Sequence, residues 1–257
     1  MADAPGWPGI AARWTSSAKT GVGTALSPVS RVWFTGSHGI LNEVYYPRVD
    51  QACTRDFGMI VTDGAGFFAE EKRDCSHEFT RLEDGVPAFQ IVNTHLGGRL
   101  RITKSIISDP RHDTVLQQVR LETLQGPPLR LFCLLAPHLV NGGAHNSAWV
   151  EQYKGASMLF AEGNGTRLAL MADRPFLATS VGFVGISDGW QILHAHGQLT
   201  EQYDHASDGN VALAAARPVN GDGPILLALG FGRSGTQEAS FHARSSLPPA
   251  FSSTMER

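Results

Sequence analysis

The chain has 257 residues, of which 42% are hydrophobic and 18% are charged, and its formal net charge is −3. Such a chain can bury a large core, and its composition excludes intrinsic disorder. The sequence has no basic stripe that would release counterions from nucleic acid, and no apolar stretch approaches the ~20 residues that cross a bilayer. We therefore expect neither nucleic acid nor a membrane as a partner.

Residues 1–28 are rich in glycine, proline, serine and threonine, and they predict an N-terminal arm that packs on the domain that follows. The first residues lack a charged segment followed by an apolar run, so we expect no signal peptide in this sequence. The native compartment stays open between the cytoplasm, the periplasm and secretion.

Residues 29–235 show short apolar runs separated by glycine and Asx turns, which is typical of β-strands joined by hairpins. The predicted strands are Val29–Phe34, Leu41–Tyr46, Phe57–Thr62, Phe67–Glu71, His77–Leu82, Ala88–His95, Arg99–Ser108, Thr114–Thr123, Leu129–Ala136, Ala148–Tyr153, Ser157–Ala161, Arg167–Ala172, Gly189–His196, Asn210–Ala216 and Pro224–Phe231.

Two kinds of strand pattern occur in this region. Arg99–Ser108 alternates apolar and polar residues, as a strand with one wet face does. Leu129–Ala136 is almost continuously apolar and predicts a strand that is covered on both faces. About fifteen strands without a long helical period predict an all-β fold, a large antiparallel β-sandwich.

Residues 236–257 differ from the strand region. Thr236–Ser246 predicts a short helix, and the Pro248–Pro249 pair and a polar tail follow it. We expect this segment to begin a linker to a further domain.

The three cysteines, Cys53, Cys75 and Cys133, lie far apart in the sequence and form no C-x-x-C pair. This spacing favours buried free thiols and leaves one disulfide open as an alternative. The ten histidines do not form the tight local set that a metal site needs, and we expect neither a metal nor a cofactor.

The segment from Gly36 to Asp56 concentrates polar and aromatic residues between glycines and a proline. Rings that pack on the C–H face of a sugar, beside amide and acid groups that bond hydroxyls, would suit sugar recognition. The alternative is a packed strand and corner whose tyrosine hydroxyls are bonded internally. The candidate substrate-adjacent or interdomain residues are His38, Asn42, Glu43, Tyr45, Tyr46, Arg55 and Asp56.

The residues 14–25 (WTSSAKTGVGTA), 32–35 (VWFT) and 38–47 (HGILNEVYYP), followed by Cys53–Asp56, resemble the start of prokaryotic glucoamylases and glucodextranases of glycoside hydrolase family 15. Shorter matches continue in order, at 137–143, 187–191 and 228–232. The resemblance covers about residues 5–247.

This resemblance implies an N-terminal supersandwich of the galactose-mutarotase type, a linker and a C-terminal (α/α)6 barrel that carries both catalytic glutamates. The sequence contains none of the barrel motifs, so the resemblance assigns no catalytic residue here. It implies a non-catalytic domain that packs against, and shapes or stabilises, a barrel that releases glucose from the ends of α-glucans. An independent carbohydrate-binding module and a mutarotase-like sugar enzyme are the alternatives. The Gly36–Asp56 segment is expected to face the barrel.

Overall fold

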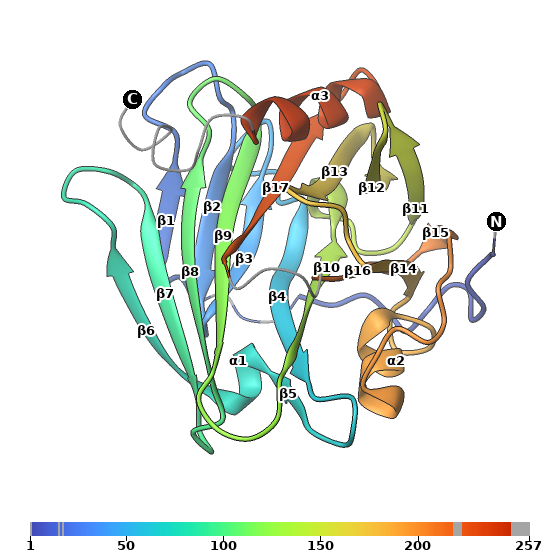
Figure 1. The fold of residues 1–257 in the computed structure, drawn as a ribbon. Coiled ribbons are helices and arrows are strands. Elements are labelled where there is room, and N and C mark those ends of the chain that lie inside the picture. Colours follow the sequence, from blue (N-terminus) through green and yellow to red (C-terminus); the bar gives the residue numbers. More distant parts are fainter. Residues whose placement is uncertain (1, 15, 17, 218–222, 248–257) are drawn as a thin grey trace.

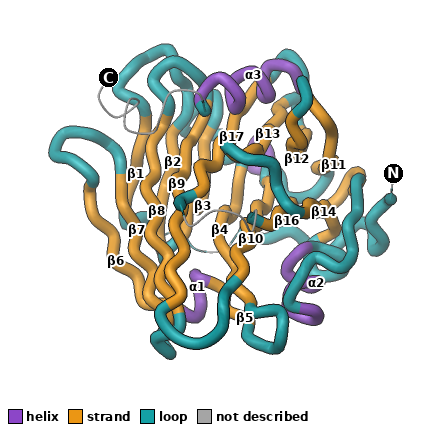
Figure 2. The backbone as a smooth tube through the Cα atoms, viewed as in Figure 1, coloured by secondary structure: helices purple, strands orange, loops and turns teal. Residues whose placement is uncertain are grey.

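The structure is a computed structural model that describes residues 2–14, 16, 18–217 and 223–247. Two antiparallel sheets lie face to face, and two of the short helices lie on their outer surfaces (Figures 1 and 2). This arrangement confirms the predicted all-β sandwich.

Strands are the main secondary structure of the described residues, and a few short helices interrupt them. In chain order the elements are β1 (Gly21–Thr24), β2 (Trp33–Ser37), β3 (Ile40–Tyr45), β4 (Thr54–Thr62), β5 (Phe68–Glu70), α1 (Glu71–Asp74), β6 (Cys75–Arg81), β7 (Phe89–His95), β8 (Leu100–Ser108), β9 (Thr114–Thr123), β10 (Arg130–Pro137), a 3-10 turn (Leu139–Asn141), β11 (Asn146–Tyr153), β12 (Ala156–Gly163), β13 (Thr166–Ala172), β14 (Ala178–Phe183), α2 (Gly189–His196), β15 (His205–Gly209), β16 (Val211–Ala216), β17 (Ile225–Gly232) and α3 (Thr236–Ser246).

Within the described residues, the first sheet has eight strands in the order β1-β2-β3-β4-β10-β16-β14, with β5 added beside β4. The second sheet has nine strands in the order β15-β11-β12-β13-β17-β9-β8-β7-β6. Neighbours in both sheets pair antiparallel, which short hairpin connections allow. Several central neighbours, such as β4 and β10, are far apart in the sequence.

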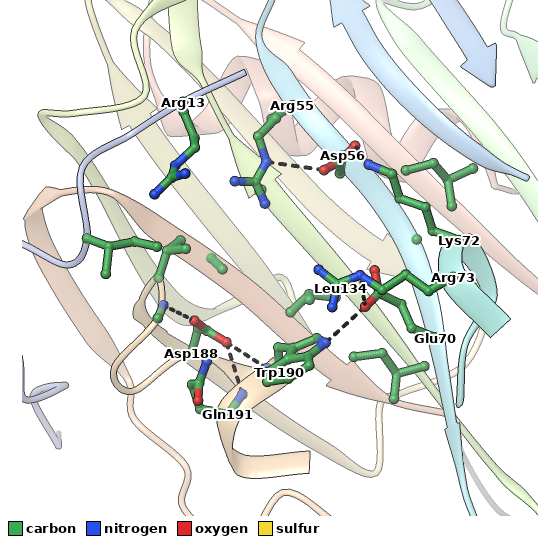
Figure 3. A pocket seen from close by; sticks show the side chains of 18 of the residues that line it. Arg13, Arg55, Asp56, Glu70, Lys72, Arg73, Leu134, Asp188, Trp190 and Gln191 are labelled. Atoms are coloured by element: carbon green, nitrogen blue, oxygen red, sulfur yellow. Dashed lines mark hydrogen bonds and ion pairs between the residues drawn. The ribbon is translucent and has the colours of Figure 1, made fainter. Parts of the chain in front are cut away.

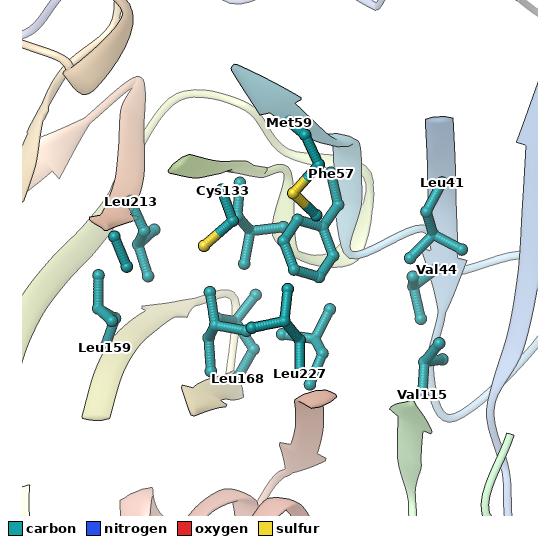
Figure 4. Packing of buried hydrophobic residues seen from close by; sticks show 14 of the residues in the cluster. Leu41, Val44, Phe57, Met59, Val115, Cys133, Leu159, Leu168, Leu213 and Leu227 are labelled. Atoms are coloured by element: carbon teal, nitrogen blue, oxygen red, sulfur yellow. The ribbon is translucent and has the colours of Figure 1, made fainter. Parts of the chain in front are cut away.

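The main core fills the space between the two sheets (Figure 4). The first sheet contributes side chains such as Phe57 and Met59, and the second contributes Leu168 and Leu227. These residues are almost fully buried, and their removal from water is the main favourable contribution to folding.

A smaller apolar cluster lies on the outer face of each sheet. Helix α2 places Ile192 and Leu193 against Ile60 and Phe132 of the first sheet. Helix α3 places Ala239 and Ala243 against the second sheet, where Gly230 of β17 leaves room for the helix backbone. A Cβ at residue 230 would lie 2.5 Å from the carbonyl oxygen of Ala239. The central strands are therefore covered on both faces.

The N-terminal residues run along elements from the far end of the chain. The N–H of Ala4 donates to the carbonyl of His205 at 2.8 Å, and the N–H of Asn210 donates to the carbonyl of Pro8 at 2.9 Å. Residues 21–24 of the same region form β1, which pairs with β2 at the edge of the first sheet. Within the described residues, no helix combines the length and apolarity needed to cross a bilayer.

Most predicted strands are present, and so is the predicted helix Thr236–Ser246. The predicted strand Leu129–Ala136 corresponds to β10, whose side chains reach both the main core and the cluster under α2. The predicted strand Val29–Phe34 is wrong in its bounds, because the strand in that region, β2, begins at Trp33.

The predicted strand Gly189–His196 is wrong, because this segment is helix α2. The carboxylate of Asp188 accepts hydrogen bonds from the N–H groups of Trp190 and Gln191, and Gly197 ends the helix with a φ of 66°. An Asx residue and a glycine at these positions are helix-capping signals. Strands β1, β14 and β15 have no counterpart among the predicted strands.

Candidate functional site

A cavity of about 520 Å³ lies on the outer face of the first sheet (Figure 3). Its floor is apolar and comes from β4, β10 and β16, with Ile60, Leu134 and Ala212 among its residues. Its walls are residues 10–14 of the N-terminal arm, residues 70–73 at α1, and residues 184–191 at the start of α2. Such a volume is within the range of small-molecule sites.

Helix α2 supplies one polar wall. The Asp188 carboxylate caps the helix and also accepts a hydrogen bond from the N–H of Gly185. Burial raises the pKa of this carboxyl group, and the backbone donors oppose the shift. The carboxylate is thereby fixed in place, and it holds Trp190 and Gln191 beside the cavity (Figure 3).

Trp190 links α2 to the end of β5 across the cavity. Its indole Nε1 donates to Glu70 at 3.0 Å, and Arg73 forms an ion pair with the same carboxylate at 3.3 Å. His194 stacks on the indole ring with ring centroids 4.8 Å apart. These contacts fix the ring of Trp190 on the cavity wall.

Behind α1 lies an ion pair that is completely removed from solvent. The Nζ of Lys104 lies 2.6 Å from Oε1 of Glu71, and both side chains are 0% exposed. Glu71 also accepts from the Nδ2 of Asn93 at 2.7 Å and from the N–H of Met59 at 2.9 Å. Lys104 donates to the carbonyl of Gly39 at 2.6 Å. The network joins both sheets to α1 and so supports the residues that point into the cavity.

On another side of the cavity, the carboxylate of Asp56 in β4 interacts with several donors. It pairs with the Nε of Arg55 at 3.2 Å and with the Nζ of Lys72 at 3.0 Å. The Nδ2 of Asn42 lies 3.4 Å from its Oδ1. Asp56 therefore connects β3, β4 and α1.

Next to Arg55 and beneath the arm lies His138, which is 1% exposed. Trp14 contacts its ring edge to face, with centroids 4.7 Å apart. Among the described residues neither ring nitrogen of His138 has a hydrogen-bond partner. Burial, with the nearby charge of Arg55, lowers the pKa of His138 to about 4, so the ring is neutral at neutral pH.

Of the residues predicted from the sequence, Arg55 and Asp56 line the cavity, and Asn42 lies behind them. Asn42 is fully buried and accepts from the hydroxyl of Ser37 at 2.6 Å. His38 is outside the cavity, at an exposed turn with a φ of 50°.

The remaining predicted residues form two separate groups. Glu43 pairs with Lys19 at 2.7 Å. Burial and then the charge of Glu43 raise the pKa of Tyr45, and Lys19 opposes the shift. Tyr46 is fully buried, stacks on Phe231, and accepts from Arg31 at its hydroxyl. Burial raises the pKa of Tyr46 strongly. Its hydroxyl is thus bonded internally, which was one of the two alternatives for this segment.

Most of the cavity residues were not predicted from the sequence. Arg13, Trp14, Glu70, Lys72, Arg73, Asp188 and Gln191 line the cavity but come from separate stretches of the chain. The capping signal at Asp188 and Gly197 was the one local pattern that could have placed α2 and Trp190 beside the sheet.

The three cysteines are free and buried, in agreement with the favoured interpretation. Across residues 2–14, 16, 18–217 and 223–247, no group of three histidine, cysteine or acidic residues is placed to hold a metal ion.

The sequence profile of the family described as "Glucodextranase, domain N" matches residues 4–257. This chain belongs to that family. A curated relative, the glucoamylase of Clostridium sp. (strain G0005), is 33% identical over 229 residues, which cover 88% of this chain and 32% of the relative. This chain thus spans about a third of the length of that relative.

A solved structure of a bacterial glucoamylase complexed with acarbose is also similar to this chain. It superimposes with a TM-score of 0.96 at 30% identity, over 100% of this chain and 38% of that chain. A glycosyl hydrolase of family GH92, ccman5, has a TM-score of 0.55 at 9% identity, over 91% of this chain and 33% of that chain. The second likeness concerns the fold alone.

Proposed function

We propose that this chain is the non-catalytic N-terminal domain of a larger glucoamylase-type hydrolase, and that it packs against and shapes or stabilises the catalytic domain. In this proposal the catalytic domain is an (α/α)6 barrel that releases glucose from the non-reducing ends of α-glucans. The observation that carries the proposal is the superposition of the whole chain on 38% of a bacterial glucoamylase with a TM-score of 0.96.

The chemistry of the carboxylates supports a non-catalytic role. Glycoside hydrolysis needs a carboxylic acid with a raised pKa that can reach the leaving oxygen. Burial raises the pKa of Glu71 and of Asp188. Glu71, however, is enclosed with Lys104, and Asp188 is bonded to backbone N–H groups, so neither is free to protonate a sugar.

A test uses this chain and the catalytic domain of its own enzyme as separate proteins. We expect the chain alone to release no glucose from maltotetraose. We expect the catalytic domain to gain thermal stability when the chain is added at equimolar concentration, since binding to the folded state stabilises it. Glucose release by the chain alone, or the absence of any association, would contradict the proposal.

A further inference from the structure

The carboxylates around the cavity on the first sheet are already engaged. Asp188 accepts from three backbone N–H groups, and Glu70 accepts from Trp190 and pairs with Arg73. Asp56 pairs with Arg55 and Lys72. These oxygens have little remaining capacity to accept hydrogen bonds from a ligand.

Two of the cationic side chains that line the cavity, Arg13 and Arg55, have unused donors. Arg13 forms no hydrogen bond or ion pair within the part of the chain that the structure describes, and Arg55 uses only its Nε there. The side chain of Arg55 is 21% exposed and lines the cavity, where its unused N–H groups remain accessible. A carboxylate that enters the cavity would offer these guanidinium groups charge-assisted hydrogen bonds, which are stronger than those between neutral groups.

The net charge of the lining also favours an anion. Lys104, which lies outside the lining, balances the charge of Glu71. The four cations of the lining, Arg13, Arg55, Lys72 and Arg73, then outnumber its three other carboxylates. A guanidinium group presents parallel N–H donors that match the two oxygens of a carboxylate. The apolar floor and the ring of Trp14 offer contact to the carbon atoms that carry such a group.

We propose that this cavity is a binding site for the carboxylate group of an organic molecule, with Arg13 and Arg55 as its principal donors. The carboxylate comes either from a small organic acid or from an acidic side chain of a partner domain. This assignment goes beyond the proposed function, and its first test does not depend on that function.

The first test is isothermal titration calorimetry of the 257-residue chain at low ionic strength with glucuronate, with citrate and with maltotriose. We expect saturable binding of at least one acid, weakened several-fold by 0.5 M NaCl because salt screens the charges. We expect no heat from maltotriose. Binding of maltotriose as tight as that of the acids would overturn the proposal.

The variants Arg13→Gln and Arg55→Gln test the assigned donors. Each should weaken acid binding about tenfold or more, because charge-assisted bonds to the carboxylate are lost. Arg48→Gln is the matched control, since Arg48 is exposed, pairs with Asp50 and does not line the cavity. Melting curves identify any variant that fails to fold, and Arg13 is exposed, so its replacement leaves the fold intact. Unchanged acid affinity in Arg13→Gln and in a folded Arg55→Gln would overturn the assignment.

A second test covers the case in which a protein supplies the carboxylate. The separate catalytic domain is titrated into the chain and into both arginine variants, with citrate as a competitor. Weaker association of the variants and competition by citrate would support the proposal. If no acid binds the chain and the arginine variants associate as the parent does, the proposal fails. If the catalytic domain does not associate at all, the proposed function fails, and the first test still decides this inference.

Discussion

The ammonium group of Lys104 lies 2.6 Å from the carboxylate of Glu71, and both side chains are sealed from solvent between the sheets and α1. Removal of one member leaves the other as an unpaired buried charge, which costs about 3–5 kcal/mol. We expect Glu71→Ala and Lys104→Met each to lower the free energy of unfolding by about that amount, measured by urea denaturation.

The combination of Glu71→Gln with Lys104→Met is the informative comparison, because it removes both charges. We expect it to be more stable than either single variant. The control is Glu122→Ala, which breaks an exposed pair with Arg101 at 3.9 Å and should cost under ~1 kcal/mol. Single variants at Glu71 and Lys104 as stable as this control would show that the buried pair does not act as described.

His138 makes the stability depend on pH. Its pKa is about 4 in the folded chain and about 6.5 in an unfolded one. The unfolded state therefore binds more protons between these values, and stability falls as the pH drops from about 6.5 to about 4. The loss attributable to His138 is about 3 kcal/mol at the low end, from the size of the shift.

The measurement is the free energy of unfolding at several pH values for the parent and for His138→Leu. The leucine variant should lose stability less steeply below pH 6.5, since it lacks the titrating group. His196→Leu, at an exposed position of α2, should retain the pH dependence of the parent. Parallel curves for the parent and His138→Leu would disprove this assignment.

Gly230 lets α3 approach the second sheet. Because a Cβ there would overlap backbone atoms of Ala239 and Ala243, Gly230→Ala must push the helix away. We expect a loss of roughly 1–3 kcal/mol, typical of overpacking, and faster amide hydrogen exchange in α3. Gly223→Ala is the control, since a Cβ at that residue meets no atom within 4 Å. Equal exchange rates in α3 of the two variants would contradict this interpretation.

The cysteines should be unreactive in the native chain. Burial raises the pKa of the thiol of Cys53 to about 11 and those of Cys75 and Cys133 to about 12, and the thiolate is the reactive form. We expect no reaction with a disulfide reagent at pH 8 on the timescale of minutes, and reaction of all three thiols in denaturant. Prompt labelling of one thiol in the native state would place that cysteine nearer to solvent than the structure does.

The fold could largely be predicted from the sequence because its dominant signals are local. β8 alternates along its length, and β10 is apolar throughout because one face meets the main core and the other meets α2. The helix α2 was missed because eight residues give too short a period to distinguish a helix from a strand. Only its capping residues, Asp188 and Gly197, indicated that this segment is a helix.

The cavity could not be assembled from the sequence. Arg55 and Asp56 lay within the segment chosen for its polar and aromatic content, but Arg13, Lys72 and Trp190 reach the cavity from other elements. The pairing of β4 with β10 and the path of the N-terminal arm decide which of these side chains come together. In the same segment Tyr46 turned inward to Arg31 and Phe231, an orientation that residue type alone does not decide.

The N-terminal arm places a constraint on the order in which this domain is made. Its contacts join residues about 200 positions apart, among them Ala2 with Asp204 and Trp7 with Asp208. During translation the residues of the arm therefore lack these hydrogen-bond partners until nearly the entire sandwich has been synthesised. Pairings at such separation slow folding, so the domain should reach its native state late in translation, and a nascent chain stalled before residue 204 should remain sensitive to protease.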